Sequence, residues 1–324
     1  MKHLLEIIDL QEYFPARKSL FGQTLWVRAV DGVNFHIDEA ETLGLVGESG
    51  SGKSTIGFMI LRLLQPTKGK ILFQGENIVA LSKHEMMAFR RDVQIVFQDP
   101  YSSLNPRKTV EDVLTRPFRI HKFAKTRNEA RKMVLDLLED VGLTPPETFL
   151  RRYPHEMSGG QRQRVAVARA IALKPKLVIA DEAVSSLDVS IRAQILNLLK
   201  DLQKKYHLAF LYITHDLATL RSVSHRVAVM YLGKLVEVGT TEEVFQNPLH
   251  PYTKALLASV PVPDPVYSRQ REPIILSGDM PSPISPPSGC RFHTRCPMMR
   301  EACTLEEPPM VDVGNSHIVT CLLN

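Results

Sequence analysis

Apolar residues recur along this chain in two patterns, one that alternates with polar residues and one that is nearly unbroken. Alternation around turn residues over 4–8 and 29–37 predicts short antiparallel strands within residues 1–45. Nearly unbroken apolar runs predict strands buried on both faces. These runs span 43–46, 93–97, 177–180 and 209–214, and a further strand with a turn is predicted over 69–75.

Helical patterns lie between these strands. Residues 56–64 form an apolar, helix-favouring run directly after the first buried strand. From 101 to about 154 the composition shifts to charged helical segments, and one of them, 130–141, has an apolar stripe. A second stripe over 191–202 predicts another amphipathic helix. The fold class is therefore α/β, with an antiparallel β subdomain and an inserted α-helical region.

The loop between the strand at 43–46 and the helix at 56–64 has the spacing G-x-x-x-x-G-K-[ST]. Its residues are Gly47, Glu48, Ser49, Gly50, Ser51, Gly52, Lys53, Ser54 and Thr55. Glycines let backbone N–H groups turn toward an anion, the new helix directs its positive end at the anion, and Lys53 reaches the terminal phosphates. The Ser54 hydroxyl is suited to binding magnesium. We therefore predict a nucleotide-phosphate site; the plainer alternative is a glycine turn that only starts a helix.

Chemically useful side chains follow two of the buried strands. Asp181 and Glu182 end the run at 177–180, and strand alternation predicts that they point to opposite sides. For hydrolysis of a phosphoanhydride, Asp181 suits the magnesium shell and Glu182 suits polarisation of the attacking water. The alternative is a solvated loop start. His215 ends the run at 209–214 and is a candidate γ-phosphate sensor, although a lone histidine is more often structural.

Two further features are consistent with nucleotide binding. Ser158 is placed to cap a helix, and Gly159 and Gly160 leave backbone N–H groups open to another anion. Such a cap is also common without a ligand. Tyr13 and Phe14 precede the phosphate loop, where an aromatic ring either stacks on an adenine or joins the core.

Length, charge and the start of the chain narrow the class of protein. At 324 residues the chain exceeds most single domains, so we expect more than one module. No run approaches the roughly 18 apolar residues of a membrane span, and the acidic start with Glu6 predicts no secretory signal and a cytoplasmic location. The net charge of +5 is spread along the chain, which favours an anionic nucleotide or membrane-proximal partner over nucleic acid.

Taken in order, these motifs resemble those of the ATP-binding cassette (ABC) ATPases over about residues 1–255. The set comprises Walker A at 47–55, the Q-loop residue Gln98, the signature Ser158-Gly159-Gly160-Gln161, Walker B at Asp181-Glu182, the D-loop Ser186-Leu187-Asp188 and the H-loop residue His215. The resemblance implies that the chain is an ATPase that uses ATP and Mg²⁺.

The resemblance also implies how these residues share the nucleotide. Gln98 joins Ser54 and Asp181 at the magnesium ion and links it to a helical subdomain at about 101–160. Two cassettes pair head to tail, so that 158–161 and Asp188 of one chain close on the ATP held by the other. Tyr13 is the implied adenine-stacking residue, with Phe14 as the alternative.

Three further segments, 98–106, 152–156 and 247–257, are similar to the dipeptide and oligopeptide importer ATPases. This implies a second ATPase subunit, usually a different chain, and two transmembrane permeases. It also implies a periplasmic or lipid-anchored solute-binding protein and a peripheral position on the cytoplasmic side of the inner membrane. No nucleic-acid partner is implied.

Two departures from the family pattern are minor. Met157 stands where leucine is commonest before the signature, and Ala183-Val184 stands where Pro-Thr is common after the catalytic glutamate. The residues with assigned chemistry are retained. They are Lys53, Gln98, Glu182 and His215.

The resemblance predicts ATP-driven uptake of di- and oligopeptides, against three alternatives. The same machinery in relatives moves nickel chelates or other small solutes. A soluble cassette ATPase acting on nucleic acid or the ribosome fits the basic charge, but such proteins usually carry long coiled-coil insertions or two cassettes, which this chain lacks. A P-loop kinase or GTPase explains Walker A alone.

The final part of the chain, 256–324, is predicted to be a separate extension. From about 261 it is rich in proline, which disfavours helix and predicts an extended, docked arm. It contains all four cysteines of the chain, Cys290, Cys296, Cys303 and Cys321.

Clustered cysteines in a reducing cytoplasm predict a metal site or inert thiols rather than disulfides. The spacing C-x5-C-x6-C-x17-C is wider than usual zinc pairs, and four thiolates suit a [4Fe–4S] cluster. Some peptide-importer ATPases carry such a cluster in this extension. Zinc or no metal remain alternatives, with His293 and His317 as substitute ligands.

Overall fold

The computed structural model describes residues 3–18, 24–260, 276 and 278–323. The chain forms two compact units. The first consists of Met1–His36, Thr42–Val79 and Ile213–Asn324, and the second of Ile37–Glu41 and Ala80–Tyr212. The short 3-10 helix η1 (Ile78–Ala80) lies where the chain passes from the first unit to the second.

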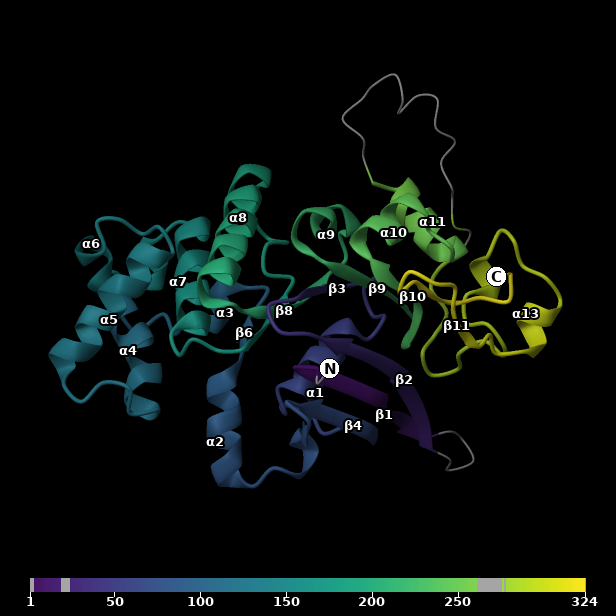
Figure 1. Ribbon diagram of the computed structural model, residues 1–324, viewed down its shortest axis with the longest axis horizontal. Helices are drawn as coiled ribbons and strands as arrows, with labels where there is room; N and C mark the ends of the chain where they lie inside the picture. Colours follow the sequence, from purple (N-terminus) through teal and green to yellow (C-terminus); the bar gives the residue numbers. More distant parts are fainter. Residues whose placement is uncertain (1–2, 19–23, 261–275, 277, 324) are drawn as a thin grey trace, which may run out of the picture. The chain divides into compact units, whose positions relative to one another are not determined.

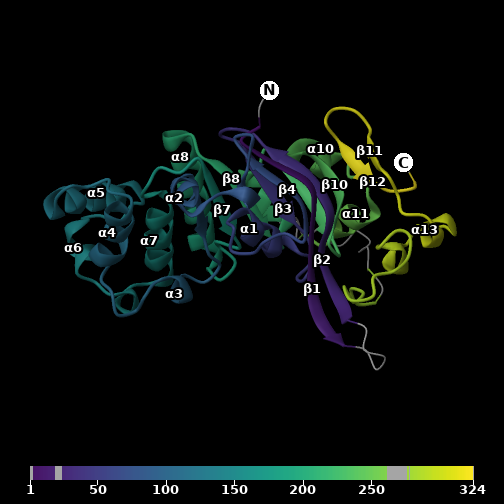
Figure 2. The same ribbon diagram turned by 90° about the horizontal axis from the view of Figure 1, so that it is seen from below.

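The first unit begins with a four-stranded sheet in the order β2-β1-β4-β5 (Figures 1 and 2). Its strands are β1 (Leu5–Lys18), β2 (Thr24–Ile37), β4 (Lys68–Phe73) and β5 (Glu76–Asn77). Strand β1 pairs antiparallel with β4, so Leu5 lies opposite Phe73 and Ile7 opposite Ile71. These four side chains are buried, which confirms the alternating pattern at 4–8 and the strand predicted at 69–75.

Strands β1 and β2 are 14 residues each, so the prediction of short strands was wrong in length. The register between β1 and β4 shifts between Ile8 and Gln11, and Asp9 has a φ of 45°. A bulge of this kind interrupts the two-residue alternation without ending the strand. The apolar–polar alternation therefore stops at the bulge, although strand β1 continues to Lys18.

A second sheet segment of the first unit has the order β11-β12-β10-β9-β3. Strand β3 (Thr42–Val46) is fully buried and pairs in parallel with β9 (Arg226–Tyr231), which pairs antiparallel with β10 (Lys234–Thr240). The unit's longer helices are α1 (Lys53–Ile60), α9 (Leu217–Val223), α10 (Thr241–Gln246) and α11 (Pro251–Ala258). The strand–loop–helix order predicted around 47–55 is confirmed.

The described part of the C-terminal extension beyond α11, residues 278–323, is drawn yellow-green to yellow in Figure 1 and has little regular structure. Its elements are η3 (His293–Arg295), α13 (Ala302–Leu305), β11 (Met310–Asp312) and β12 (Ile318–Thr320). Strand β12 pairs antiparallel with β10, which docks the extension as predicted. Several of the prolines that carried the prediction, Pro261, Pro263, Pro265 and Pro273, lie outside the described residues.

The buried carboxylate of Glu237 on β10 contacts both the start of α11 and the extension. The residue is 1% exposed, and its carboxylate accepts hydrogen bonds from the backbone N–H groups of Leu249 and His250 at 2.9 and 2.8 Å. His317 Nε2 lies 2.7 Å from the same carboxylate, and His317 Nδ1 lies 3.9 Å from Glu243. The Nε2 of His317 is therefore engaged by Glu237, and the suggestion of His317 as a substitute metal ligand stays a prediction.

The second unit places strands in the order β8-β7-β6. They are β6 (Val93–Val96), β7 (Leu177–Asp181) and β8 (Ala209–Thr214), with β6 and β7 parallel. The helices are α2 (Lys83–Asp92), α3 (Pro100–Ser103), α4 (Val110–Ile120), α5 (Arg127–Asp140), α6 (Glu147–Leu150), η2 (Pro154–Glu156), α7 (Gly159–Ile171) and α8 (Val189–Tyr206). The predicted buried strands and the inserted helical region are confirmed.

Helix α7 is the centre of the helical region, since it packs against α3, α4, α5 and α8. The stripe predicted on α5 is buried at Val134, Leu137 and Leu138. Among the described residues, no helix is both long enough and apolar enough to cross a bilayer.

Candidate functional site

The phosphate loop of the first unit folds around the ammonium group of Lys53. The Lys53 Nζ donates to the carbonyl oxygens of Gly47 and Glu48, both at 2.8 Å, and lies 3.3 Å from Ser51 Oγ. Lys53 is only 5% exposed, so these oxygens replace the water that its charge has lost. The loop therefore has a closed form that is set by its own cation.

Glycine is required at two positions of this loop for steric reasons. A Cβ at Gly52, whose φ is 104°, would lie 2.1 Å from the Ala29 carbonyl oxygen. A Cβ at Gly47 would lie 2.1 Å from the Met230 carbonyl oxygen. The loop thus lies directly against the backbone of β2 and β9, and a side chain at either position would displace it.

Tyr13 on β1 is held by a carboxylate. Its hydroxyl donates to Asp31, and burial, followed by this hydrogen bond, raises the pKa of Tyr13 to about 12. The Arg28 guanidinium lies 5.9 Å from the centre of the Tyr13 ring, within cation–π range. Phe14, the alternative stacking residue, is half-buried on the next position of the strand.

A turn connects the position of Tyr13 to the phosphate loop. The Asp31 N–H donates to the Gly233 carbonyl at 2.9 Å, and the Gly233 N–H donates to the Ser51 carbonyl at 2.9 Å. Gly233 has a φ of 82°, which suits the tight turn between β9 and β10. Tyr13, Asp31, Gly233 and Ser51 are therefore joined in one hydrogen-bonded series.

His215 belongs to the first unit and follows β8, as predicted, with an exposed side chain. The next residue, Asp216, caps helix α9 by accepting from the Ala218 N–H at 3.0 Å and from the Thr219 hydroxyl at 2.6 Å. The Asp216 N–H donates to Thr214 Oγ1 at 3.0 Å. These bonds fix the backbone on both sides of His215.

In the second unit, Gln98 and Glu182 are brought together. The Gln98 Nε2 donates to Glu182 Oε2 at 3.0 Å, and the Ser186 hydroxyl lies 3.5 Å from the Gln98 carbonyl oxygen. Asp181 is buried at the end of β7. The sequence predicts that strand alternation sets the direction of the Glu182 side chain. Glu182 lies just beyond the strand with a φ of 47°, so alternation does not set it. Its direction is set by the turn that it begins.

Gln163 is a site residue that sequence reasoning missed. It lies on α7, is fully buried, and its Nε2 donates to the Ala183 carbonyl at 2.6 Å. The contact ties the signature helix to the residue after Glu182. A polar residue within a helix normally suggests a solvated face, and its place among the buried α7 residues was the only available signal.

The signature residues begin helix α7 with a capping box. Ser158 Oγ accepts from the Gln161 N–H at 3.3 Å, and the Gln161 side chain accepts from the Ser158 N–H at 3.1 Å. A Cβ at Gly160 would lie 2.8 Å from the Ile191 side chain, whereas Gly159 has room. Asp188, at the start of α8, is exposed.

The four cysteines of the extension lie near one another. Cys303 and Cys321 are buried and the other two are half-buried, and all four thiols are free. Burial, and after it the charges of the three other cysteines, raise the pKa of Cys290 to about 11. The Cys290 N–H donates to the Cys303 carbonyl at 2.9 Å, and His293 Nδ1 lies 2.9 Å from the Cys290 carbonyl. The thiols are thus close enough to interact with one another, and their service as a metal ligand set stays a prediction.

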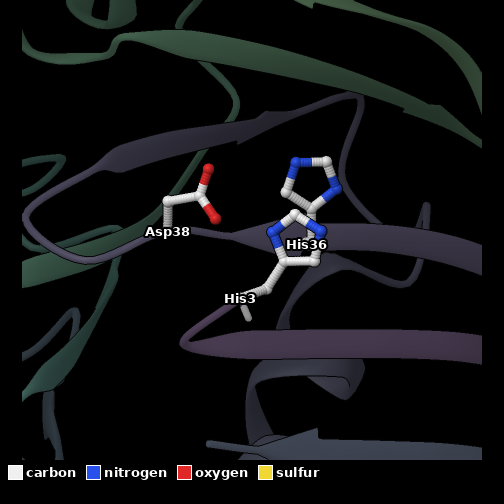
Figure 3. Close-up of side chains that lie close together, drawn as sticks. All are labelled: His3, His36 and Asp38. Carbon is white, nitrogen blue, oxygen red and sulfur yellow. The ribbon is translucent and has the colours of Figure 1, made fainter. Parts of the chain in front are cut away.

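His3 and His36 form a second group of potential ligands, which the sequence did not indicate. Their rings are stacked with centroids 3.8 Å apart and an interplanar angle of 26° (Figure 3). Figure 3 also labels Asp38, two residues beyond His36. The lone pairs of an imidazole lie in its ring plane, so nearly parallel stacked rings do not direct them at a common ion. We interpret the stack as packing between the start of β1 and the end of β2.

Comparisons with known proteins find matches to both the cassette region and the C-terminal region of the chain. The family model for the ABC transporter matches residues 30–185, and the model for the oligopeptide/dipeptide transporter C-terminal region matches 236–303. The oligopeptide transport ATP-binding protein AppF of Bacillus subtilis is 50% identical over 99% of this chain and 97% of its own length. OppF of Escherichia coli is 46% identical over 99% and 96%, and the dipeptide transport protein DppF of Haemophilus influenzae is 45% identical over 98% and 96%.

Solved structures show the same fold. The chain is similar to cbiO1 of Clostridium perfringens, part of the ABC transporter complex cbiONQ, with a TM-score of 0.64 and 29% identity over 76% of this chain and 92% of that chain. It is also similar to the ATP-binding cassette MJ0796 in a dimer bound to ADP and Pi. There the TM-score is 0.65, and the identity is 29% over 73% of this chain and 98% of that chain.

We predict that Gly52→Ala destabilises the protein by at least about 2 kcal/mol more than Gly278→Ala, as measured by urea unfolding. Both glycines have positive φ, 104° and 72°, so an alanine is strained at either position. Only at Gly52 would the new Cβ also meet a carbonyl oxygen, since Gly278 has nothing within 4 Å. Equal losses for the two variants would contradict the steric argument.

Proposed function

Because this chain belongs to the ABC transporter family, among its oligopeptide and dipeptide transport ATP-binding proteins, we propose that it hydrolyses ATP to drive uptake of di- or oligopeptides across the cytoplasmic membrane. The observation that carries this proposal is that the similarity runs through the C-terminal region as well as the cassette. A cassette alone would indicate an ATPase without indicating the cargo.

The proposed division has the nucleotide-binding domain at 1–255, its helical subdomain at about 101–160 and the transporter-type extension at 256–324. Within the cassette, Lys53 and the loop from Gly47 to Thr55 would hold the phosphates, and Tyr13 would stack on the adenine. The Asp31 bond that fixes Tyr13 favours it over Phe14, because stacking requires a ring held in one orientation.

The donors at the magnesium position would be oxygen atoms from Ser54, Gln98 and Asp181. This set suits Mg²⁺, which prefers oxygen ligands, and the Asp181 carboxylate is buried at the end of β7. When bound, the ion neutralises charge that develops on the phosphate oxygens. Gln98 would also link the magnesium position to the helical region, because it lies between β6 and α3 along the chain.

Glu182 is the proposed residue that polarises the attacking water. The Gln98 amide donates to its carboxylate, which orients the carboxylate as an acceptor. His215 would contact the γ-phosphate from the first unit. Phosphoryl transfer is catalysed mainly by positioning and charge, so each residue has an electrostatic or orienting role.

The proposed assembly has two cassettes, in which Ser158, Gly159, Gly160, Gln161 and Asp188 of one close on the nucleotide of the other. The open N–H groups at the start of α7 suit a phosphate, and the related cassette MJ0796 is a dimer. The second ATPase would be a different chain. Two permeases would complete the transporter in the membrane, and a periplasmic or lipid-anchored binding protein would deliver the peptide. This chain would lie on the cytoplasmic side.

The extension is proposed to hold a metal centre on Cys290, Cys296, Cys303 and Cys321. The four thiols lie in one segment in which the Cys290 N–H donates to the Cys303 carbonyl at 2.9 Å, and a metal would remove the protons that burial retains on them. A [4Fe–4S] cluster is the first candidate for four thiolates at this spacing, ahead of zinc. Such a centre would stabilise the described part of the extension, which has few helices and strands of its own.

The proposed function is tested by reconstituting the chain with its neighbouring permeases and binding protein. We expect ATPase activity to rise when the binding protein carries di- or tripeptides, because cargo must promote closure of the cassettes. The matched control is the same complex with Lys53→Ala. ATPase activity that does not respond to peptides but does respond to another solute would support the assignment as an importer ATPase and contradict the assignment of peptides as its cargo.

Glu182→Gln is expected to reduce ATP turnover at least about 100-fold while ATP binding and the closed dimer persist. The substitution removes the carboxylate that polarises water but keeps its shape. Steady-state phosphate release and gel filtration with ATP measure the two effects, and Glu147→Gln on the exposed end of α6 is the control. Normal phosphate release by the variant would exclude Glu182 from this role.

The metal proposal predicts about four iron and four acid-labile sulfide per chain after anaerobic purification. Replacing Cys290 and Cys303 by serine should remove both, together with the visible absorbance of the cluster. Ser288→Ala, a substitution two residues before Cys290, serves as the control. Stoichiometric zinc would select the alternative metal, and neither metal would leave the thiols as packing residues.

A further inference from the structure

Arg295, in the cysteine-bearing extension, forms an ion pair with the phosphate loop. Its Nη1 lies 3.0 and 3.1 Å from the two carboxylate oxygens of Glu48, the second residue of that loop. The Arg295 side chain is 9% exposed, whereas that of Glu48 is 32% exposed. The pair is thus shielded on the arginine side, and its attraction is less screened than that of a surface pair.

The main chain of Glu48 is engaged as well. Its carbonyl accepts from Lys53 Nζ at 2.8 Å, and its N–H donates to the Tyr252 hydroxyl at 3.0 Å. Glu48 therefore connects the loop cation, helix α11 and the extension. An ionised carboxylate at this position would repel a bound phosphate unless a cation neutralised it, and Arg295 supplies that cation.

Arg291 makes the corresponding contact on the side of Tyr13. Its Nη2 pairs with one carboxylate oxygen of Asp31, and the Tyr13 hydroxyl donates to the other. Its Nη1 donates to the Leu232 carbonyl at 2.6 Å, in the turn whose Gly233 N–H reaches Ser51. Arg291 thus supports Tyr13 through Asp31, and its bond to the Leu232 carbonyl holds the guanidinium in place.

Packing fixes the segment that carries both arginines. Phe292 is 1% exposed, and its ring centroid lies 5.1 Å from that of Tyr231, 5.4 Å from that of Tyr252 and 5.5 Å from that of His250. The extension's Pro283 carbonyl also accepts from the Arg28 N–H at 3.0 Å. The two guanidinium groups are therefore held on a rigid support rather than on a free tail.

We propose that Arg291 and Arg295 are positioning residues of the nucleotide site: Arg291 orients Tyr13 toward the adenine through Asp31, and Arg295 neutralises and holds Glu48 beside the phosphates. This rests on the proposed function in taking ATP as the ligand of the loop. It assigns to the C-terminal extension a part in nucleotide binding, in addition to its cysteines.

The test measures binding of ATP and of inorganic tripolyphosphate to the full-length chain by calorimetry. Arg295→Ala should weaken both ligands about tenfold, because both carry the phosphates. Arg291→Ala should weaken ATP about tenfold and tripolyphosphate much less, because tripolyphosphate has no adenine. Arg300→Ala, an exposed arginine of the same extension, is the control and should change neither. All variants are matched for metal content and for urea midpoint.

A double variant separates charge neutralisation from a purely structural role. If Arg295 acts by neutralising Glu48, then Glu48→Gln in the Arg295→Ala background should recover most of the affinity for tripolyphosphate. No recovery, or wild-type affinity in both single variants, would overturn the inference. A wild-type chain that binds neither ligand would instead overturn the proposed function itself, so the two failures are distinguishable.

Discussion

The ammonium group of Lys53, surrounded by oxygen atoms of its own loop, is the contact on which the nucleotide site depends. It is nearly buried, and carbonyl oxygens 2.8 Å away replace its hydration. The cation that would meet the phosphates therefore also shapes the loop before they arrive. The glycines at 47 and 52 are a consequence, because the closed loop lies against the backbones of β2 and β9.

The loop is also stabilised from outside the cassette motifs. Glu48 occupies a position that the motif leaves open, yet its carbonyl, N–H and carboxylate are all engaged, the last two by residues 204 and 247 positions away. The Walker A motif includes the residues expected to contact the ligand, but it does not include the residues that hold the loop in place. In this chain Arg295 of the extension is one of those supporting residues.

Local chemistry explains which features the sequence could predict. The strand at 43–46, the strand at 177–180 and the Ser158 cap depend on neighbouring residues, and each was found. The contact of Gln98 with Glu182, the buried Gln163 and the Arg291–Asp31 pair depend on residues brought together only by the fold. The length of β1 was missed for another reason, because the bulge at Asp9 breaks the alternation on which strand prediction depends.

The distance along the chain between Glu48 and Arg295, and between Asp31 and Arg291, has a consequence for biosynthesis. Partners 247 and 260 residues apart are made at opposite ends of translation. The early strands and the phosphate loop leave the ribosome first, while both arginines still await synthesis. Until the last segment emerges, the carboxylates of Glu48 and Asp31 lack these counterions. A nascent or prematurely terminated chain therefore has a complete Walker A sequence with an incomplete nucleotide site.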